Sequence, residues 1–250
     1  MRQITKSIML ASLLFGLPLA GNADTVRLTS LEWPPYTGEA VPQQGASMAV
    51  VEAAFEAMGY ELEVNFYPWQ RAVDQASNNP DYAGYFPEYY ASSVEEDFIF
   101  SDPIGTGPLG FVEHADDPVA WDSLDDLGDR TIGTVAGYVN TDEFDARVED
   151  GRIEVEEVTS DEINVRKVAG GRIPMAVIDQ NVLDYLLANE PSLEEAGDQV
   201  QFNDRLLEDK ELFVAFARDS HGEEMAEVLN EGLQKIDVEQ IMDDVFEQAQ

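Results

Sequence analysis

The stretch 131–188, TIGTVAGYVNTDEFDARVEDGRIEVEEVTSDEINVRKVAGGRIPMAVIDQNVLDYLLA, alternates short apolar runs with segments of helical spacing. Strands are predicted at 131–134, 153–158 and 175–179, and helices at 141–148, 160–169 and 181–188. Thr141 and Ser160 are of the residue types that commonly cap helix N-termini. Strand–helix alternation of this kind indicates an α/β fold with mainly parallel sheets.

The same alternation extends outward in both directions along the chain. Before this stretch, strands are expected at 25–31, 61–67, 83–86 and 110–113, with helices at 47–58 and from Pro68. After it, we expect a strand at 212–217, a helix to Lys235 that starts in a capping box of Ser220 and Glu223, and a last helix at 238–248. No Pro- or Ser-rich linker interrupts the chain, so two domains would have to be joined by ordered strands.

The first 23 residues read as a secretory signal peptide. Arg2 and Lys6 precede an apolar run at 8–19, and small residues follow at 21–23. The apolar run is too short to span a bilayer. We expect cleavage after Ala23, export to the periplasm, and no membrane insertion of the mature chain.

Composition narrows the classes of function. The chain has 51 acidic and 14 basic residues and a formal charge of −37, which argues against binding to nucleic acid or to anionic membranes. The acids are spread along the sequence, which is typical of proteins that work in high salt, although a merely acidic periplasmic protein is the alternative. There is no cysteine, so neither disulfides nor a lipid-anchored cysteine is expected. His114 and His221 are far apart and are expected at the surface, so no metal site or cofactor is predicted.

Several aromatic residues follow predicted strands or lie in turns, where a core needs them least. Trp33, Tyr36, Trp69 and Tyr89 could stack on a planar group or surround a cation, and ordinary packing is the alternative. We add Phe86, at the end of the strand at 83–86, to these candidate binding residues.

Charged and loop residues complete the candidate site. Arg71 could hold a carboxylate through two parallel hydrogen bonds, or form a surface ion pair. Asp179 ends an apolar strand, where it could pair with an ammonium group or cap the next helix. Thr134, Gly137 and Tyr138 belong to a loop after a strand, whose backbone N–H groups suit an anion.

Five pieces of sequence carry a family resemblance. They are EWPPY at 32–36, YPWQR at 67–71, FIFSDP at 98–103, IGTVAGY at 132–138 and AVID at 176–179. In this order, behind a signal peptide, they resemble the family-3 extracellular solute-binding proteins, the polar amino-acid binding group of ABC importers. The resemblance covers nearly all of the mature chain.

The resemblance implies a type II periplasmic binding protein fold with two lobes, each a central mixed sheet flanked by helices. Lobe 1 would comprise 24–110 and 213–250, and lobe 2 would comprise 111–212. Two hinge crossings, near 107–112 and 212–217, would allow the lobes to close on a small polar solute. The resemblance also implies that Asp179 holds the ligand's amino group, that ABC importer membrane subunits are partners, and that the protein is a monomer.

The sequence departs from the family at one position. Amino-acid binders of this family carry an arginine six residues before the Phe of the Phe-Ser-Asp motif, where it clamps the ligand carboxylate. Val94 occupies that position here. Either Arg71 replaces the clamp, or the ligand is a cationic or zwitterionic solute such as an osmolyte.

Two other functions compete with transport. Some relatives of these binding proteins are periplasmic dehydratases, and Glu32, Glu88 or Asp179 could act as acid or base, although no paired catalytic constellation is evident. A ligand-sensing partner of a membrane receptor would have the same lobes. We expect a binding protein and not an enzyme.

Overall fold

The computed structural model describes residues 24–249, so the predicted signal peptide lies outside the described residues. The described chain forms strands and helices in alternation, as the sequence predicts. The strands are β1 (Asp24–Ser30), β2 (Tyr60–Phe66), β3 (Gly84–Tyr89), β4 (Phe98–Phe100), β5 (Gly105–His114), β6 (Thr131–Val135), β7 (Glu154–Val158), β8 (Met175–Asp179), β9 (Val200–Phe202) and β10 (Glu208–Ala217).

The helices lie between these strands and cover them. They are α1 (Ala46–Ala57), α2 (Trp69–Asn78), α3 (Ser92–Glu95), α4 (Asp142–Glu149), α5 (Asp161–Ala169), α6 (Gln180–Asn189), α7 (Ser220–Leu233) and α8 (Val238–Ala249), with short 3-10 turns η1 (Pro42–Gln44), η2 (Leu124–Leu127) and η3 (Pro191–Leu193). None of the helices within 24–249 is long and apolar enough to cross a membrane.

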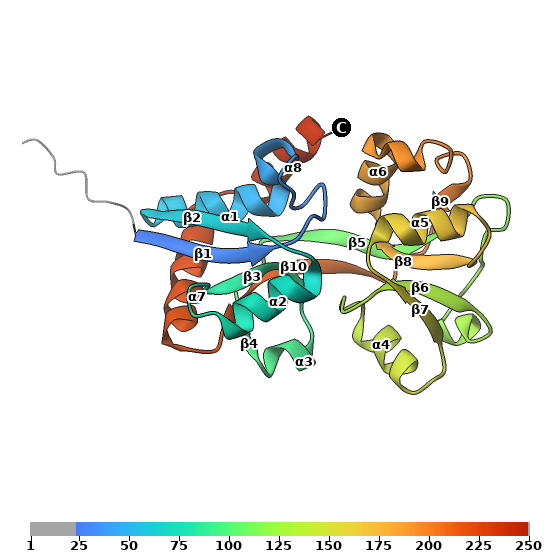
Figure 1. The fold of residues 1–250 in the computed structure, drawn as a ribbon, viewed down its shortest axis with the longest axis horizontal. Coiled ribbons are helices and arrows are strands. Elements are labelled where there is room, and N and C mark those ends of the chain that lie inside the picture. Colours follow the sequence, from blue (N-terminus) through green and yellow to red (C-terminus); the bar gives the residue numbers. More distant parts are fainter. Residues whose placement is uncertain (1–23, 250) are drawn as a thin grey trace, which may run out of the picture.

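The elements are grouped in two lobes, which confirms the expected fold class (Figure 1). One lobe holds β1 to β4 with α1, α2, α3, α7 and α8, and the other holds β6 to β9 with α4, α5 and α6. The strand order is β2-β1-β3-β10-β5-β8-β6-β7, with β4 also paired to β10 and β9 to β5. Pairs among β1, β2 and β3 and among β6, β7 and β8 are parallel, whereas β5 and β10 pair antiparallel to their neighbours.

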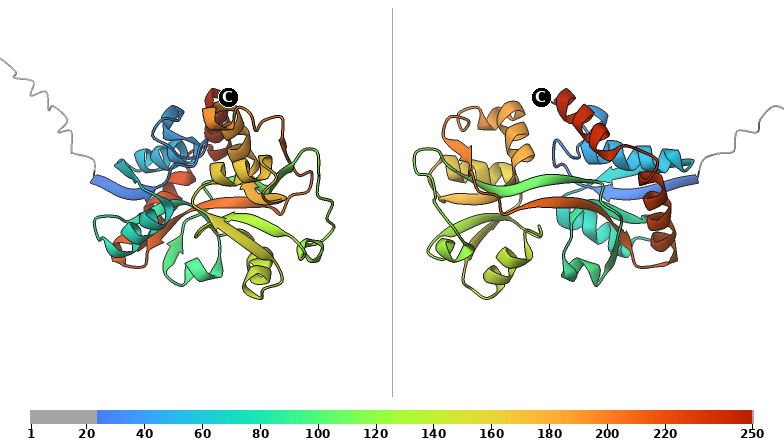
Figure 2. Two further views of the ribbon diagram at one scale, coloured as in Figure 1. Left: turned by 45° about the vertical axis from the view of Figure 1, so that its right-hand side comes forward. Right: turned by 180° about the vertical axis from the view of Figure 1, so that it is seen from behind.

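Two long strands, β5 and β10, connect the lobes and run side by side between them (Figure 2). Residues 105–109 of β5 pair with residues 208–212 of β10. Beyond this ladder, β5 continues into the second lobe beside β8, and residues 212–217 of β10 pair with β3 and β4 in the first lobe. The paired stretch of β10 between the lobes therefore begins four residues before the predicted crossing at 212–217.

Burial follows the sequence pattern that predicted the elements. β8, at the centre of the second lobe, is buried at all five positions, whereas β2 alternates between exposed and half-buried residues at the sheet edge. Helix α1 ends before Gly59, whose φ of +85° suits a residue without a side chain. Two caps differ from the prediction. Ser160 occupies the N-cap position of α5, but its side chain makes no capping hydrogen bond. Helix α7 is capped by Asp219, which accepts from His221 N and Gly222 N, and Ser220 is already the first helical residue.

Candidate functional site

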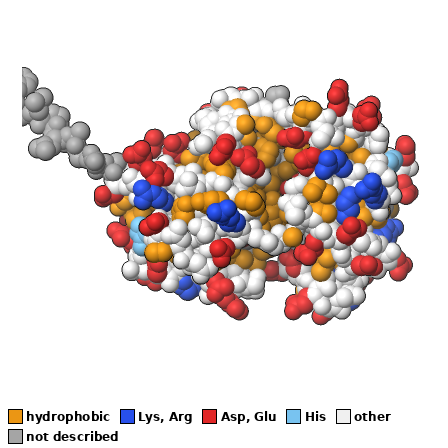
Figure 3. Space-filling view, viewed as in Figure 1, with side chains coloured by type: hydrophobic (Ala, Val, Ile, Leu, Met, Phe, Trp, Pro, Cys, Tyr) orange, Lys and Arg blue, Asp and Glu red, His pale blue; other side chains and the backbone are white. Residues whose placement is uncertain are grey.

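A cleft lies between the lobes, and Figure 3 shows hydrophobic side chains in this hollow with acidic side chains around it. Its inner part is a cavity of about 30 Å³, room for about two water molecules. A wider groove of about 620 Å³ adjoins it and shares Leu31, Trp33, Trp69 and Tyr138 with its walls. The cavity is lined by Leu31, Trp33, Trp69, Pro87, Glu88, Tyr89, Tyr138, Val139 and Leu212.

Three of the predicted aromatic residues form one cluster on the first lobe. Trp33 stacks on Tyr36 with ring centroids 4.6 Å apart, and meets Tyr89 edge-on at 6.0 Å. Trp33 and Tyr36 lie in the turn after β1, which a backbone bridge between Trp33 and Thr37 closes, and Tyr89 ends β3. All three rings are buried. Of the three, Trp33 and Tyr89 line the cavity, and Tyr36 packs behind Trp33.

Trp69 reaches from the first lobe to the second. It is the first residue of α2, after Pro68, and its indole Nε1 donates to the carbonyl oxygen of Gly137 at 2.8 Å. Its ring also meets Tyr138 edge-on at 5.7 Å. Gly137 has a φ of +81°, which turns the loop after β6 so that this carbonyl faces the indole. The loop predicted as an anion site thus contacts Trp69. One of its backbone N–H groups, that of Tyr138, is already used in a hydrogen bond to Val135 O.

Asp179 takes one of the two roles that the sequence left open for it, the helix cap. It is the N-cap of α6, and its Oδ1 accepts from Asn181 N at 2.8 Å and from Val182 N at 3.2 Å. Across the cleft, the hydroxyl of Tyr36 lies 3.1 Å from Asp179 Oδ2. The same hydroxyl accepts a hydrogen bond from Asn181 Nδ2 at 2.8 Å. Burial raises the pKa of Tyr36, so its hydroxyl stays protonated and donates to Asp179.

Three carboxyl groups are buried at the cleft. Glu88 lines the cavity, Asp161 lines the outer groove, and Asp179 lies behind Tyr36. Burial raises the pKa of each to about 7, although hydrogen bonds lower it in part. Glu88 and Asp161 therefore bring two buried acidic groups to the walls of the cleft.

One lysine is buried near these acids. Lys210 lies on β10, with its Nζ 3.6 Å from Glu208 Oε1 and 5.4 Å from the centre of the Tyr89 ring. It lowers the pKa of Glu88 and Asp145 by its charge. Lys210 does not line the cavity or the groove, and the described residues that do line them include no lysine or arginine.

Six predicted residues line neither the cavity nor the groove, namely Tyr36, Arg71, Phe86, Thr134, Gly137 and Asp179. Arg71 is exposed, with its guanidinium carbon 4.9 Å from the centre of the Tyr67 ring. Phe86 is fully buried in the first-lobe core, and Thr134 is buried within β6. Val94, at the position of the family's arginine, is half-buried in α3. Within residues 24–249, therefore, no guanidinium lines the cavity.

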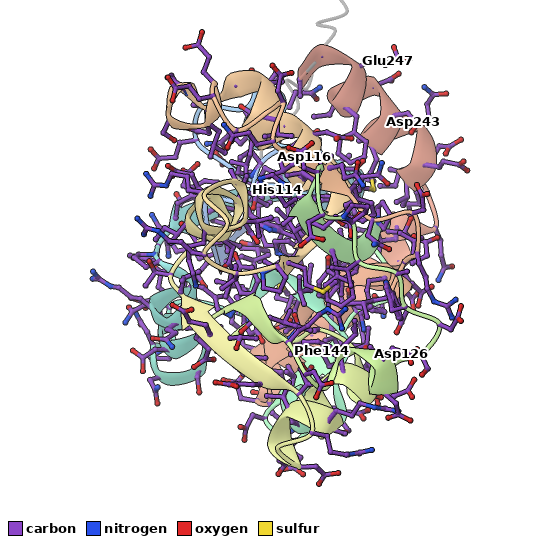
Figure 4. All side chains as sticks on the ribbon, turned by 90° about the vertical axis from the view of Figure 1, so that its right-hand side faces the viewer. His114, Asp116, Asp126, Phe144, Asp243 and Glu247 are labelled. Carbon is purple, nitrogen blue, oxygen red and sulfur yellow. The ribbon has the colours of Figure 1, made fainter. Side chains whose placement is uncertain are left out.

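The histidines and acids give no metal site within residues 24–249. His221 is exposed. His114, at the end of β5, is half-buried, and its Nδ1 accepts from Asp116 N at 3.2 Å (Figure 4). Both lie away from the cleft walls.

The sequence analysis did not identify Glu88, Asp161, Lys210, Pro87 and Val139 as binding residues. Glu88 was considered only as an acid or base of an enzyme, because the strand predicted at 83–86 ends before it. In the structure β3 continues through Pro87 to Tyr89, opposite a register shift in β10 between Phe213 and Ala215. Asp161, as the first residue of α5, has the pattern of an ordinary N-terminal acid.

Comparison with known proteins identifies the fold. No protein-family model and no curated protein sequence matches the chain. Among solved structures, a histidine kinase sensor domain with similarity to periplasmic binding proteins matches with a TM-score of 0.75 and 16% identity, over 91% of this chain and 96% of that one.

Two further structures show the same architecture with ligands bound. The GluR0 ligand-binding core from Nostoc punctiforme in complex with L-glutamate has a TM-score of 0.70 and 18% identity, covering 89% of this chain and 98% of that one. The amino acid ABC transporter substrate-binding protein AbpA from Streptococcus pneumoniae, bound to L-arginine, has a TM-score of 0.70 and 16% identity, covering 90% and 95%. The chain therefore has the two-lobed periplasmic binding protein fold that the sequence resemblance implied.

Proposed function

We propose that the protein is a periplasmic solute-binding protein, which captures a small polar solute between its lobes and hands it to the membrane subunits of an ABC importer. The observation that carries this proposal is the cleft itself. Side chains from both lobes, Trp33, Trp69 and Glu88 from one and Tyr138 and Asp161 from the other, meet around it. The solute is amino-acid-like, zwitterionic or cationic, and it is bound without turnover.

The ligand site that we propose comprises the predicted residues Trp33, Tyr36, Trp69, Tyr89, Gly137, Tyr138 and Asp179, to which we add Glu88 and Asp161. The lobes are 24–110 with 213–250, and 111–212, and the chain works as a monomer after cleavage behind Ala23. Opening is a hinge motion of β5 and β10, which are the strands that cross between the lobes. Opening lets the solute enter, because the cavity lies between side chains of both lobes.

A thermal shift screen across a solute library tests this function. A ligand at a hundredfold excess over its Kd stabilises the folded protein by about 2.7 kcal/mol, which raises the Tm of a domain of this size by about 5–10 °C. We expect one class of small polar solutes to produce such a shift. No shift with any amino acid, amine, osmolyte or sugar would refute the proposal.

A second candidate is a sensory role, in which the closed protein signals to a membrane receptor. Two of the similar structures favour it, the histidine kinase sensor domain and the BvgS VFT2 domain from Bordetella pertussis, the latter with a TM-score of 0.72 and 18% identity over 90% of this chain and 93% of that one. Cross-linking of the ligand-loaded protein in its own cells separates the two candidates. An importer subunit is expected as the partner, and a receptor kinase would favour sensing.

A further inference from the structure

Glu88 places a carboxyl group inside the cavity with binding capacity left over. Its side chain is 5% exposed. Oε2 accepts from the Tyr85 hydroxyl at 2.9 Å, and Oε1 accepts from Tyr89 N at 2.8 Å. A carboxylate offers about four acceptor positions, so about two remain for a donor that enters the cavity. The nearby Lys210 makes its ion contact with Glu208 instead.

The hydroxyl of Tyr89 is a second polar group at this site with unused hydrogen-bonding capacity. Tyr89 is 7% exposed and lines the cavity, yet its buried hydroxyl has no hydrogen-bond partner. Asp161 and Asp179 both act on this hydroxyl by their charge. Because an unpaired buried hydroxyl is costly, a site that retains one is suited to a ligand that completes it.

The remaining walls favour a cation over an anion. Trp33, Trp69 and Tyr138 present aromatic surfaces, which attract ammonium groups through the negative faces of their rings. A ligand carboxylate in this cavity would meet Glu88 and would find no basic side chain among the described lining residues. The described lining of this cavity therefore favours a cation over an anion.

The volumes of the cavity and of the adjoining groove indicate the shape of such a ligand. The cavity of about 30 Å³ matches an ammonium head group, since it holds about two waters. The groove of about 620 Å³ begins at the shared walls Trp33 and Trp69, and it carries the acids Glu32, Asp161, Glu162 and Glu190. An extended amine could thus place its head in the cavity and a polar or cationic tail in the groove.

We propose, on the basis of the solute-binding function above, that Glu88 and the Tyr89 hydroxyl form an ammonium subsite, and that the solute is an organic amine without an α-carboxylate. The ammonium donates one hydrogen bond to the Glu88 carboxylate and another to the Tyr89 hydroxyl oxygen. The alkyl stem passes between the indoles of Trp33 and Trp69.

Pairs of probes that differ only in the α-carboxylate test the substrate class. Isothermal titration calorimetry at pH 8 with the mature protein would compare agmatine with arginine, putrescine with ornithine, and cadaverine with lysine. Removing a carboxylate that faces a buried acid should tighten binding about tenfold or more in at least one pair, since two like charges held together in a site cost binding free energy of that size or more. Tighter binding of the amino acid in the pairs would overturn the proposal.

Variants test the two named residues. Glu88→Gln keeps the shape and removes the charge, and it should weaken amine binding about tenfold or more. Tyr89→Phe should weaken it about fivefold and leave the Tm of the ligand-free protein unchanged or higher, because the hydroxyl it removes has no partner there. Glu224→Gln, the same change at an exposed position of α7, is the matched control and should bind as the parent protein does. Unchanged affinity in both Glu88→Gln and Tyr89→Phe would rule out the subsite.

The outcomes separate this inference from the proposed function. If no amine or amino acid binds but another solute of the library raises the Tm, the ammonium subsite is wrong and solute binding stands. If nothing in the library binds, the proposed function fails with it.

Discussion

At the residue scale, Asp179 shows how a position can be predicted while its partners are not. Its place at the end of an apolar strand suggested either a ligand contact or a helix cap. The cap is observed, and the carboxylate also accepts from Tyr36, which is 143 positions away in the sequence. That second contact exists only because the lobes meet, so no local pattern could reveal it. Asp161 was missed because its position at the start of α5 is that of an ordinary N-terminal acid, and Glu88 was identified only as a candidate acid or base of an enzyme.

The buried carboxyls predict an unusual pH dependence of stability. The pKa values of Glu88, Asp161 and Asp179 rise to about 7 from ordinary values of 4.5 and 3.8, because burial disfavours their charged forms. The folded protein therefore holds protons that the unfolded chain has released, so the free energy of unfolding falls between about pH 4 and pH 7 and levels off above. Each group accounts for up to about 3–4 kcal/mol.

Thermal melts of the ligand-free protein between pH 5 and pH 8 check this dependence. High salt should be held constant so that surface charges stay screened. Tm is expected to fall with rising pH, with a shallower slope in Glu88→Gln and an unchanged slope in Glu224→Gln. A Tm that rises from pH 5 to pH 7 would show that these carboxyls are ionised in the folded state.

Gly107 on β5 gives a steric prediction. A Cβ at this position would collide with Asp179 Oδ2 and with the Tyr36 hydroxyl, the two groups that meet across the cleft. Gly107→Ala should therefore destabilise the closed protein by about 1–3 kcal/mol, as overpacking in a tight site does. Chemical denaturation measures the change. Gly197→Ala, where nothing lies within 4 Å of the added Cβ, is the control and should be nearly neutral.

At the element scale, the order of strands and helices followed from hydrophobic period and caps, whereas the ends of elements did not. β3 was predicted to end at Phe86, since Pro87 is a poor strand residue, but it continues opposite an irregularity in β10. The short elements β4, β9 and α3 were too brief to show a period. The cap of α7 was placed one residue late because Ser220 and Asp219 are both suitable capping residues.

The contact between α2 and the loop after β6 predicts a shift between open and closed forms. Trp69→Phe keeps an aromatic ring but removes the hydrogen bond from Nε1 to Gly137 O. Losing it should cost the closed form about 1 kcal/mol, roughly a fivefold change in the closed-to-open ratio. Small-angle X-ray scattering of the ligand-free protein should show a larger radius of gyration in Trp69→Phe. An unchanged radius, with the Tm also unchanged, would show that this bond does not hold the lobes together.

At the scale of the whole molecule, charge opposes closure. The chain carries a formal charge of −37, and the acids Asp184 on α6 and Asp243 and Glu247 on α8 line one groove where the lobes face each other (Figure 4). Salt shortens the reach of this repulsion from about 10 Å at 0.1 M to about 3 Å at 1 M.

Raising NaCl from 0.1 to 2 M should therefore stabilise the protein, with a Tm increase of about 5 °C or more, equivalent to ~1–2 kcal/mol for a domain of this size. The double variant Asp243→Asn, Glu247→Gln should show a smaller increase, because part of the repulsion is already gone. A Tm that is flat or falls with salt would argue against high-salt adaptation of this surface.

The central claim is that the cleft between the lobes holds the solute, with Glu88 as an anchor. The most direct test is a crystal structure of the mature protein with the solute that raises its Tm most. We expect one solute molecule between the lobes, in contact with Glu88, Trp33 and Tyr138, with any amino group directed at Glu88. A solute bound elsewhere, for example in the groove beside Trp121 on the second lobe, with the cleft empty, would contradict it.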